Sequence, residues 1–162
     1  MQVRGVMAER VVVETAGEGG LAQMLAMDPR VCGTPGRREF LERAVAAGEA
    51  FVARIGGEAA GFAVFDHSFF EQPFISLLYV EPDMRRRGIA RALVTHIEAR
   101  CPEGKLFTST NASNVVMQQV CDALGFTRSG RIENLDEGDP ELVYVRRLRR
   151  REQKAESSEQ RA

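Results

Sequence analysis

Three consecutive arginines, Arg85, Arg86 and Arg87, precede Gly88 and an apolar pattern with helical spacing. The first turn of a helix presents backbone N–H groups that have no intrahelical acceptor, together with a partial positive charge. Glycine lets an anion approach the backbone closely, and the arginines, with Arg91 beyond them, add full positive charges around the same point. The stretch therefore predicts a turn that binds phosphate groups at the start of a helix.

The spacing around Gly88 is neither G-x-G-x-x-G nor G-x-x-x-x-G-K-[ST], so the common dinucleotide and nucleoside triphosphate fingerprints do not fit. The 22 Lys and Arg residues are balanced by 23 Asp and Glu residues, which gives a formal net charge of -1. A nucleic-acid-binding domain is normally strongly basic, and we therefore expect no nucleic-acid partner. The positive charge of the arginine turn has a local role.

The elements that would position this turn follow from hydrophobic periodicity and turn residues. The pattern predicts one strand, two helices, three strands, a helix, a strand, a helix and two final strands. Gly56-Gly57 is suited to a tight hairpin turn between the second and third strands. In order, the predicted elements cover residues 9–16, 21–28, 38–48, the two strands within 50–66, 74–80, 87–100, 105–111, 114–126, 126–132 and 141–148. This order predicts an α/β protein of the α+β type, with a mixed sheet of about seven strands flanked by about four helices.

The cysteines and the hydropathy of the chain indicate which types of protein can be excluded. The three cysteines, Cys32, Cys101 and Cys121, are far apart and form no C-x-x-C pair, so we expect neither a disulfide framework nor a metal site. No apolar run reaches the roughly 18 residues of a membrane span, and the first residues lack the apolar stretch of a signal peptide. We expect a cytoplasmic protein without a membrane partner, built as one domain over residues 1–148 with a charged, disordered tail at 149–162. The sequence permits a homodimer.

Two segments of the sequence carry a family resemblance. The segment Val80-Glu81-Pro82, followed by Arg85 to Ala90, resembles the signature of the GNAT superfamily N-acetyltransferases, in which Arg or Gln, two residues, Gly, one residue and Gly or Ala follow a strand that ends in Val-x-Pro. A second segment resembles the family's Asn-x-x-Ala-x-x-Leu-Tyr motif and its following Gly-Phe pair; its residues here are Asn114, Met117, Val120, Cys121 and Leu124-Gly125-Phe126. Together the resemblance covers roughly residues 10 to 148 and implies a GNAT-like, mostly antiparallel sheet.

The resemblance implies that acetyl-CoA is the co-substrate. The backbone at the end of the strand would hydrogen-bond the pantetheine arm, and the amides from Arg86 to Arg91 would face the pyrophosphate. The residues that it assigns to cofactor binding are Leu78, Val80, Arg85, Arg86, Arg87, Gly88, Ile89, Ala90, Arg91 and Asn114.

The implied reaction transfers an acetyl group directly from a thioester to an amine. An aliphatic amine has a pKa near 10 and must lose a proton before it attacks, and the leaving thiolate gains from a proton donor. Cys121 occupies the position where many members carry the Tyr that protonates this thiolate; the alternative is that Cys121 only packs in the core. Members often place a Glu on the strand before the turn, but residues 74–78 contain no carboxylate. Candidate bases nearby are His67 in a predicted loop, Glu81, Asp66 and Glu71, although a turn histidine is also commonly just exposed to solvent.

An acidic segment lies between the two last predicted strands. Five carboxylates fall within nine residues there, at Glu133, Asp136, Glu137, Asp139 and Glu141. By family analogy this connection borders the acceptor site, where Asp136, Glu137 and Asp139 would attract a cationic amine. The same composition is also typical of a solvated turn.

The sequence therefore predicts an acetyl-CoA-dependent N-acetyltransferase that acts on a primary amine of a small molecule or a peptide. The missing Tyr and the missing strand carboxylate motivate an alternative, a catalytically weak or silent module that binds or senses acyl-CoA.

Overall fold

The computed structural model describes residues 9–102 and 104–148. The tail expected at 149–162 lies outside the described residues. The order of elements confirms the fold class predicted from the sequence: seven strands form one mixed, mostly antiparallel sheet in the order β1-β2-β3-β4-β5-β7-β6, with four α-helices. By their contacts the residues form two compact units. Of the described residues, the first unit contains those up to Val64 together with Leu78–Leu93, and the second contains Phe65–Leu77 together with those from Val94 on.

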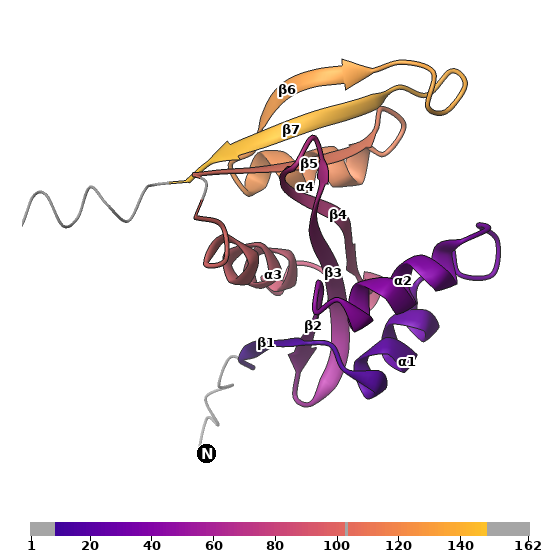
Figure 1. Cartoon of the computed structure of the whole chain (residues 1–162). Coiled ribbons are helices and arrows are strands. Elements are labelled where there is room, and N and C mark those ends of the chain that lie inside the picture. Colours follow the sequence, from indigo (N-terminus) through magenta and orange to yellow (C-terminus); the bar gives the residue numbers. More distant parts are fainter. Residues whose placement is uncertain (1–8, 103, 149–162) are drawn as a thin grey trace, which may run out of the picture. The chain divides into compact units, whose positions relative to one another are not determined.

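The first unit is built on antiparallel strands and two helices. Its elements are β1 (Val11–Thr15), α1 (Glu18–Met27), α2 (Arg37–Ala46), β2 (Ala50–Ile55) and most of β3 (Glu58–Phe69). Gly56 and Gly57 both have positive φ, at 56° and 82°, which confirms the predicted tight turn between β2 and β3. The helices α1 and α2 lie side by side (Figure 1), and the core beneath them includes the fully buried Met24, Leu41, Val52 and Phe62.

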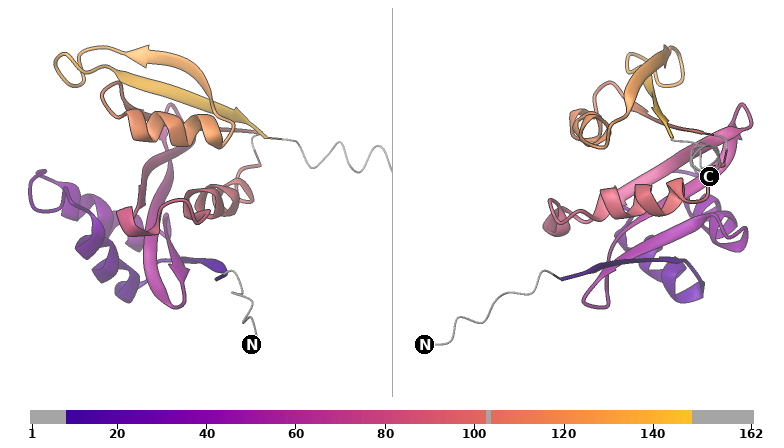
Figure 2. Two further views of the ribbon diagram at one scale, coloured as in Figure 1. Left: turned by 180° about the vertical axis from the view of Figure 1, so that it is seen from behind. Right: turned by 90° about the vertical axis from the view of Figure 1, so that its left-hand side faces the viewer.

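The second unit holds the other sheet edge. Its elements are β5 (Lys105–Asn111), α4 (Val115–Ala123), β6 (Thr127–Ile132) and β7 (Glu141–Arg147), and β7 pairs antiparallel with both β5 and β6. The helix α4 runs alongside these strands (Figure 2). On β5 the residues Leu106, Thr108 and Thr110 are buried, and they alternate with half-buried residues as expected for a strand with one covered face.

Besides β3, a strand and a helix extend from one unit into the other along the chain. Strand β4 (Gln72–Val80) pairs in parallel with β5 through Phe74 with Phe107 and Ile75 with Thr108, and helix α3 covers Ile89–Glu98. The apolar positions predicted for the inner face of α3 are almost fully buried: Ile89, Leu93, Val94 and Ile97. The predicted start of α3 at Arg87 is wrong by two residues, because Gly88 has a φ of 77° and cannot belong to the helix.

The predicted loop around His67 is also wrong. Strand β3 continues through Phe69, so His67 lies on a strand rather than in a turn. The polar sequence Asp66-His67-Ser68 interrupts the apolar run, yet this part of β3 is an exposed continuation of the strand. The turn falls instead at Phe70 and Glu71, both with positive φ, and β4 already begins at Gln72 rather than after Pro73.

Candidate active site

The end of strand β4 is fixed to its neighbour β3 within the first unit. The backbone N–H of Glu81 donates to the carbonyl of Ala60 at 2.9 Å. A short 3-10 turn (Pro82–Met84) follows, and it is closed by the Met84 N–H donating to the Glu81 carbonyl at 2.9 Å. The strand therefore stops at a defined point just before the arginine turn.

The close approach of β3 to this strand end depends on Gly61. A Cβ at Gly61 would lie 2.6 Å from the carbonyl oxygen of Tyr79, 3.0 Å from Cγ2 of Ile89 and 3.3 Å from Cα of Val80. No real Cβ sits as close as 2.6 Å to a backbone oxygen, so only glycine fits here. The absence of a side chain at Gly61 thus allows β3 to pack closely against the strand end and the first residue of α3. No sequence motif had indicated this glycine.

The arginine turn contains two residues with left-handed backbone. Arg86 has a φ of 64° and Gly88 a φ of 77°, and Arg85 before them is extended, with a φ of -67° and a ψ of 157°. The Ala92 N–H donates to the Gly88 carbonyl at 2.9 Å, which marks the first bond of α3. Among the described residues, no atom lies within 4 Å of a Cβ built on Gly88. The side chains of Arg85, Arg86 and Arg87 are exposed around this open point. The residues predicted to bind phosphate therefore form one continuous segment that runs from the 3-10 turn into α3.

Tyr79 lies between Leu78 and Val80 and was not singled out from the sequence. Its ring packs 5.6 Å from the ring of Phe62. Burial raises the pKa of the Tyr79 hydroxyl above its ordinary value of 10.0; the charges of Glu81 and Asp28 also raise it, while Arg85 acts in the opposite direction. The hydroxyl therefore keeps its proton at neutral pH. Of the candidate bases, Glu81 is half-buried and belongs to this neighbourhood.

The other predicted catalytic residues belong to the second unit. His67 is exposed, and its ring lies 5.5 Å from that of Phe65. The Asp66 carboxylate accepts the Ser68 N–H at 2.9 Å and the Ser68 hydroxyl at 2.6 Å, and Glu71 is exposed in the β3–β4 turn. The Cys121 side chain is buried in α4 at 1% exposure, and burial, with the charge of Asp122, raises its pKa to about 11.

The residues predicted at the acceptor and at the second motif make structural contacts. Asp139 accepts the N–H and the hydroxyl of Ser113, at 2.9 and 2.5 Å, and Asp136 accepts the side-chain amide of Asn111 at 2.7 Å. Asn114 is the N-cap of α4, where its side chain accepts the Met117 N–H at 3.1 Å. Glu137 is exposed. Two of the three predicted acceptor carboxylates thus fasten the β6–β7 loop to the segment that precedes α4.

Within residues 9–102 and 104–148, no group of three or more His, Cys, Asp or Glu residues could hold a metal ion. In the same part of the chain, no helix is long and apolar enough to cross a membrane.

The chain is similar in sequence and in fold to known acetyltransferases. The profile of the Acetyltransferase (GNAT) family matches residues 21–126. A GNAT family acetyltransferase from Bacillus cereus ATCC 10987 is 37% identical, with a TM-score of 0.79, over 87% of this chain and 99% of that chain. The ribosomal-protein-S18-alanine N-acetyltransferase from Escherichia coli is 19% identical over 86% of this chain and 94% of that chain, with a TM-score of 0.69.

A further structure contains the cofactor. The Salmonella typhimurium protein yncA, solved with its cofactor acetyl-CoA, is 16% identical over 86% of this chain and 94% of that chain, with a TM-score of 0.66. Since these last two identities are low, they establish likeness of fold alone. A search of curated proteins found no match.

Proposed function

Because the chain belongs to the GNAT acetyltransferase family, we propose that it transfers the acetyl group of acetyl-CoA directly to a primary amine. The observation that carries the proposal is the arginine turn. Its left-handed residues Arg86 and Gly88 stand at the start of α3, in open space, directly after a strand end that is tied to β3. Backbone N–H groups in this arrangement suit the pyrophosphate of a coenzyme.

The cofactor would be held mainly by main-chain groups. The amides from Arg86 to Arg91 would face the phosphates, and the backbone of Leu78 and Val80 would hydrogen-bond the pantetheine arm. The exposed arginine side chains support the phosphates with charge, but they are flexible and screened by salt. Acetyl-CoA supplies the activated thioester, and the protein holds this thioester in position for attack by the amine.

The transfer needs a neutral amine and a proton for the leaving group. The amine nitrogen attacks the thioester carbonyl, the C–S bond breaks, and the nitrogen loses one proton while the thiolate gains one. Glu81 is the proposed base in the neighbourhood of the strand end, with His67 as the second candidate. Cys121 is the donor expected from its motif position, but its raised pKa makes it a poor one, so the proton shed by the amine is the proposed source for the thiolate.

The acceptor is proposed to be a cationic primary amine that meets the acidic β6–β7 loop. Glu137 is exposed and available for this contact, whereas Asp136 and Asp139 shape the loop through Asn111 and Ser113. The Escherichia coli protein of similar fold is a ribosomal-protein-S18-alanine N-acetyltransferase, so short peptides belong in the set of acceptors to be tested.

The test measures CoA formed from acetyl-CoA by chromatography, with polyamines, amino acids, aminoglycosides and short peptides as acceptors and a reaction without acceptor as the control. Chromatography avoids the signal that the exposed thiol of Cys32 would give in a thiol-colour assay. CoA release that depends on one acceptor class would support the transferase. Acetyl-CoA binding without turnover of any acceptor would contradict it and favour the silent acyl-CoA-binding module.

A further inference from the structure

Arg87 of the arginine turn has an acidic neighbour from the segment that precedes β1. Its Nη1 lies 3.8 Å from Oε2 of Glu9, and the side chains are 50% exposed for Arg87 and 64% exposed for Glu9. This distance exceeds that of a hydrogen bond, so the two groups attract each other through charge alone. An ion pair that is this exposed is weak, and a better partner can replace either member.

The position of Glu9 is set by the strand that follows it. Strand β1 pairs antiparallel with β2, with Val11 opposite Ile55, and this register directs the chain before Val11 toward the β2–β3 turn. Oε1 of Glu9 lies 4.0 Å from a Cβ built on Gly56 of that turn. The carboxylate of Glu9 is therefore adjacent to both the β2–β3 turn and the arginine turn, and all three segments belong to the first unit.

A phosphate bound at the arginine turn would compete with Glu9 for the same guanidinium. Arginine presents five N–H donors in a planar fork, and a phosphate can accept two parallel charge-assisted hydrogen bonds from it. At 3.8 Å the Glu9 carboxylate makes no hydrogen bond to Arg87, so a phosphate offers Arg87 the stronger interaction. When the phosphate replaces Glu9, the attraction between Glu9 and Arg87 is lost, and this loss lowers the net affinity for the phosphate.

We propose that Glu9 is a positioning residue of the cofactor site, which acts through Arg87 by competing with the phosphates of the coenzyme. This inference rests on the proposed function. Acetyl-CoA and the product CoA carry the same phosphates, so Glu9 weakens the binding of both to the same extent. The product therefore dissociates more readily, which favours its exchange for the next acetyl-CoA.

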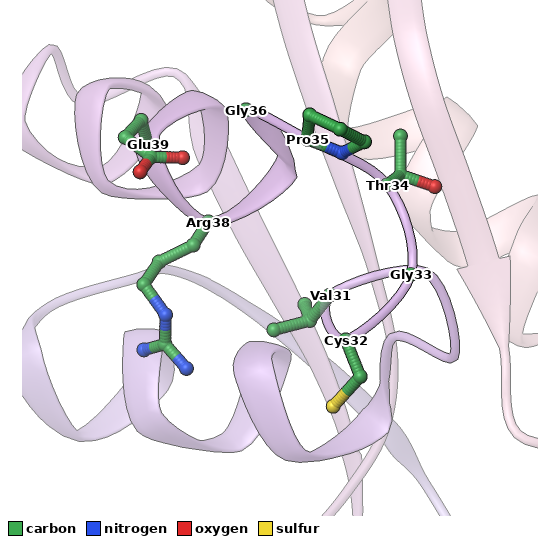
Figure 3. A pocket seen from close by; sticks show the side chains of 8 residues that line it. All are labelled: Val31, Cys32, Gly33, Thr34, Pro35, Gly36, Arg38 and Glu39. Atoms are coloured by element: carbon green, nitrogen blue, oxygen red, sulfur yellow. The ribbon is translucent and has the colours of Figure 1, made fainter.

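The test measures the Kd of acetyl-CoA and of CoA by calorimetry for Glu9→Gln, at low and at physiological salt concentration. The control is Glu39→Gln, which removes the same charge from another exposed glutamate of the first unit. Glu39 lines the cavity at the loop between α1 and α2 (Figure 3), and this loop lies across the unit from the start of β1 (Figures 1 and 2).

Glu9→Gln should bind both ligands more tightly than the control does. At low salt the Kd should fall by about two- to fivefold, which is the range expected for one exposed ion pair. The gain should shrink at physiological salt, because the charges are screened there. Since Glu9 and Glu39 are exposed, neither substitution should alter the folding of the protein, and urea denaturation of each variant checks this.

A double-mutant cycle with Arg87→Gln separates competition for Arg87 from a general effect of charge. If Glu9 acts through Arg87, Glu9→Gln should gain affinity in the wild-type background and gain none in the Arg87→Gln background. An equal gain in both backgrounds would mean that Glu9 only changes the electrostatic potential around the turn, and it would overturn the proposal.

Three other outcomes would also overturn it. Weaker binding by Glu9→Gln would mean that Glu9 orients Arg87 toward the phosphates. A gain for acetyl-CoA without a gain for CoA would contradict competition at the phosphates, which the two ligands share. An unchanged Kd in a protein that still acetylates an acceptor would refute this inference alone, whereas a wild-type protein that binds neither ligand would refute the proposed function and this inference with it.

Discussion

Replacing Gly61 with alanine tests how tightly the strand end is held. The added Cβ would lie 2.6 Å from the carbonyl oxygen of Tyr79 and 3.0 Å from Cγ2 of Ile89. The first of these neighbours is backbone, so it cannot move aside by rotating a side chain. The second belongs to Ile89, which is only 2% exposed, so moving it would disturb the packing around it. The methyl group must therefore push β3 and the end of β4 apart.

The expected cost follows from two opposing effects. Inserting a methyl group into a well-packed site costs about 1–3 kcal/mol, and the contact with a rigid backbone oxygen places this site toward the upper end. Replacing glycine with alanine also lowers the conformational entropy of the unfolded chain, which raises the free energy of unfolding by about 0.4–1 kcal/mol. We therefore expect Gly61→Ala to lower the free energy of unfolding by about 2 kcal/mol.

Urea denaturation of the variant measures this loss, with Gly130→Ala as the control. Gly130 is also a strand glycine, in β6, but no atom of the described residues lies within 4 Å of a Cβ built there. The control should change stability by less than about 0.5 kcal/mol. Because the displaced atoms belong to Tyr79 and Val80, Gly61→Ala should also weaken acetyl-CoA binding in a calorimetric titration. Equal stabilities for the two variants would refute the close-contact argument.

Three further predictions concern the turn, the acidic loop and the buried thiol. Gly88→Glu should abolish acetyl-CoA binding in calorimetry. The control is Gly48→Glu, which should bind acetyl-CoA normally, because Gly48 has a φ of 71° and equally open space, so its substitution carries the same backbone strain of about 1 kcal/mol. Retained acetyl-CoA binding by Gly88→Glu would contradict the phosphate turn. Asp139→Ala removes two hydrogen bonds to Ser113 and should lower the free energy of unfolding by about 1–2 kcal/mol in urea denaturation. An unchanged free energy of unfolding together with a raised KM for the acceptor would instead favour direct contact between Asp139 and the substrate. Burial raises the pKa of Cys121 from 9.0 to about 11, so the folded protein holds this proton more tightly than the unfolded chain; the resulting stability is complete below about pH 9 and is lost as the pH rises toward 11. The stability difference between wild type and Cys121→Val should shift over that pH range, and a constant difference would argue against the raised pKa.

The order of elements and the arginine turn could be predicted because their signals are local. Gly56-Gly57 can take the positive φ angles of a tight turn, and α3 shows its buried face through residues three and four positions apart. The turn at Gly88 combines a strand end, a glycine and a helix start within a few residues. Each of these features depends on its chain neighbours, so a single sequence contains the information.

The residues that sequence reasoning missed act through partners far along the chain. Gly61 matters because of Tyr79 and Ile89, and the buried Asp28 pairs with Arg37 from the next helix. No spacing rule marks a glycine whose Cβ would meet another strand, or an acid that becomes buried when two helices pack. The full length of β3 was also not predicted. Polar residues such as His67 interrupt the apolar pattern, but they can continue a strand where its side chains are exposed.

The buried thiol of Cys121 changes how proton transfer at this site should be understood. A thiol with a pKa of about 11 would have to protonate a leaving thiolate whose reference pKa is about 8.5, which is uphill by more than two units. The attacking amine must lose a proton in the same reaction, and that proton is far more acidic once the new C–N bond begins to form. The protein then needs only to keep the amine, the thioester and a base such as Glu81 in position, so that the proton shed by nitrogen can reach sulfur directly or through water. On this argument a cysteine at the position of the usual tyrosine is compatible with catalysis, because its place in α4 serves packing and the proton comes from the substrate.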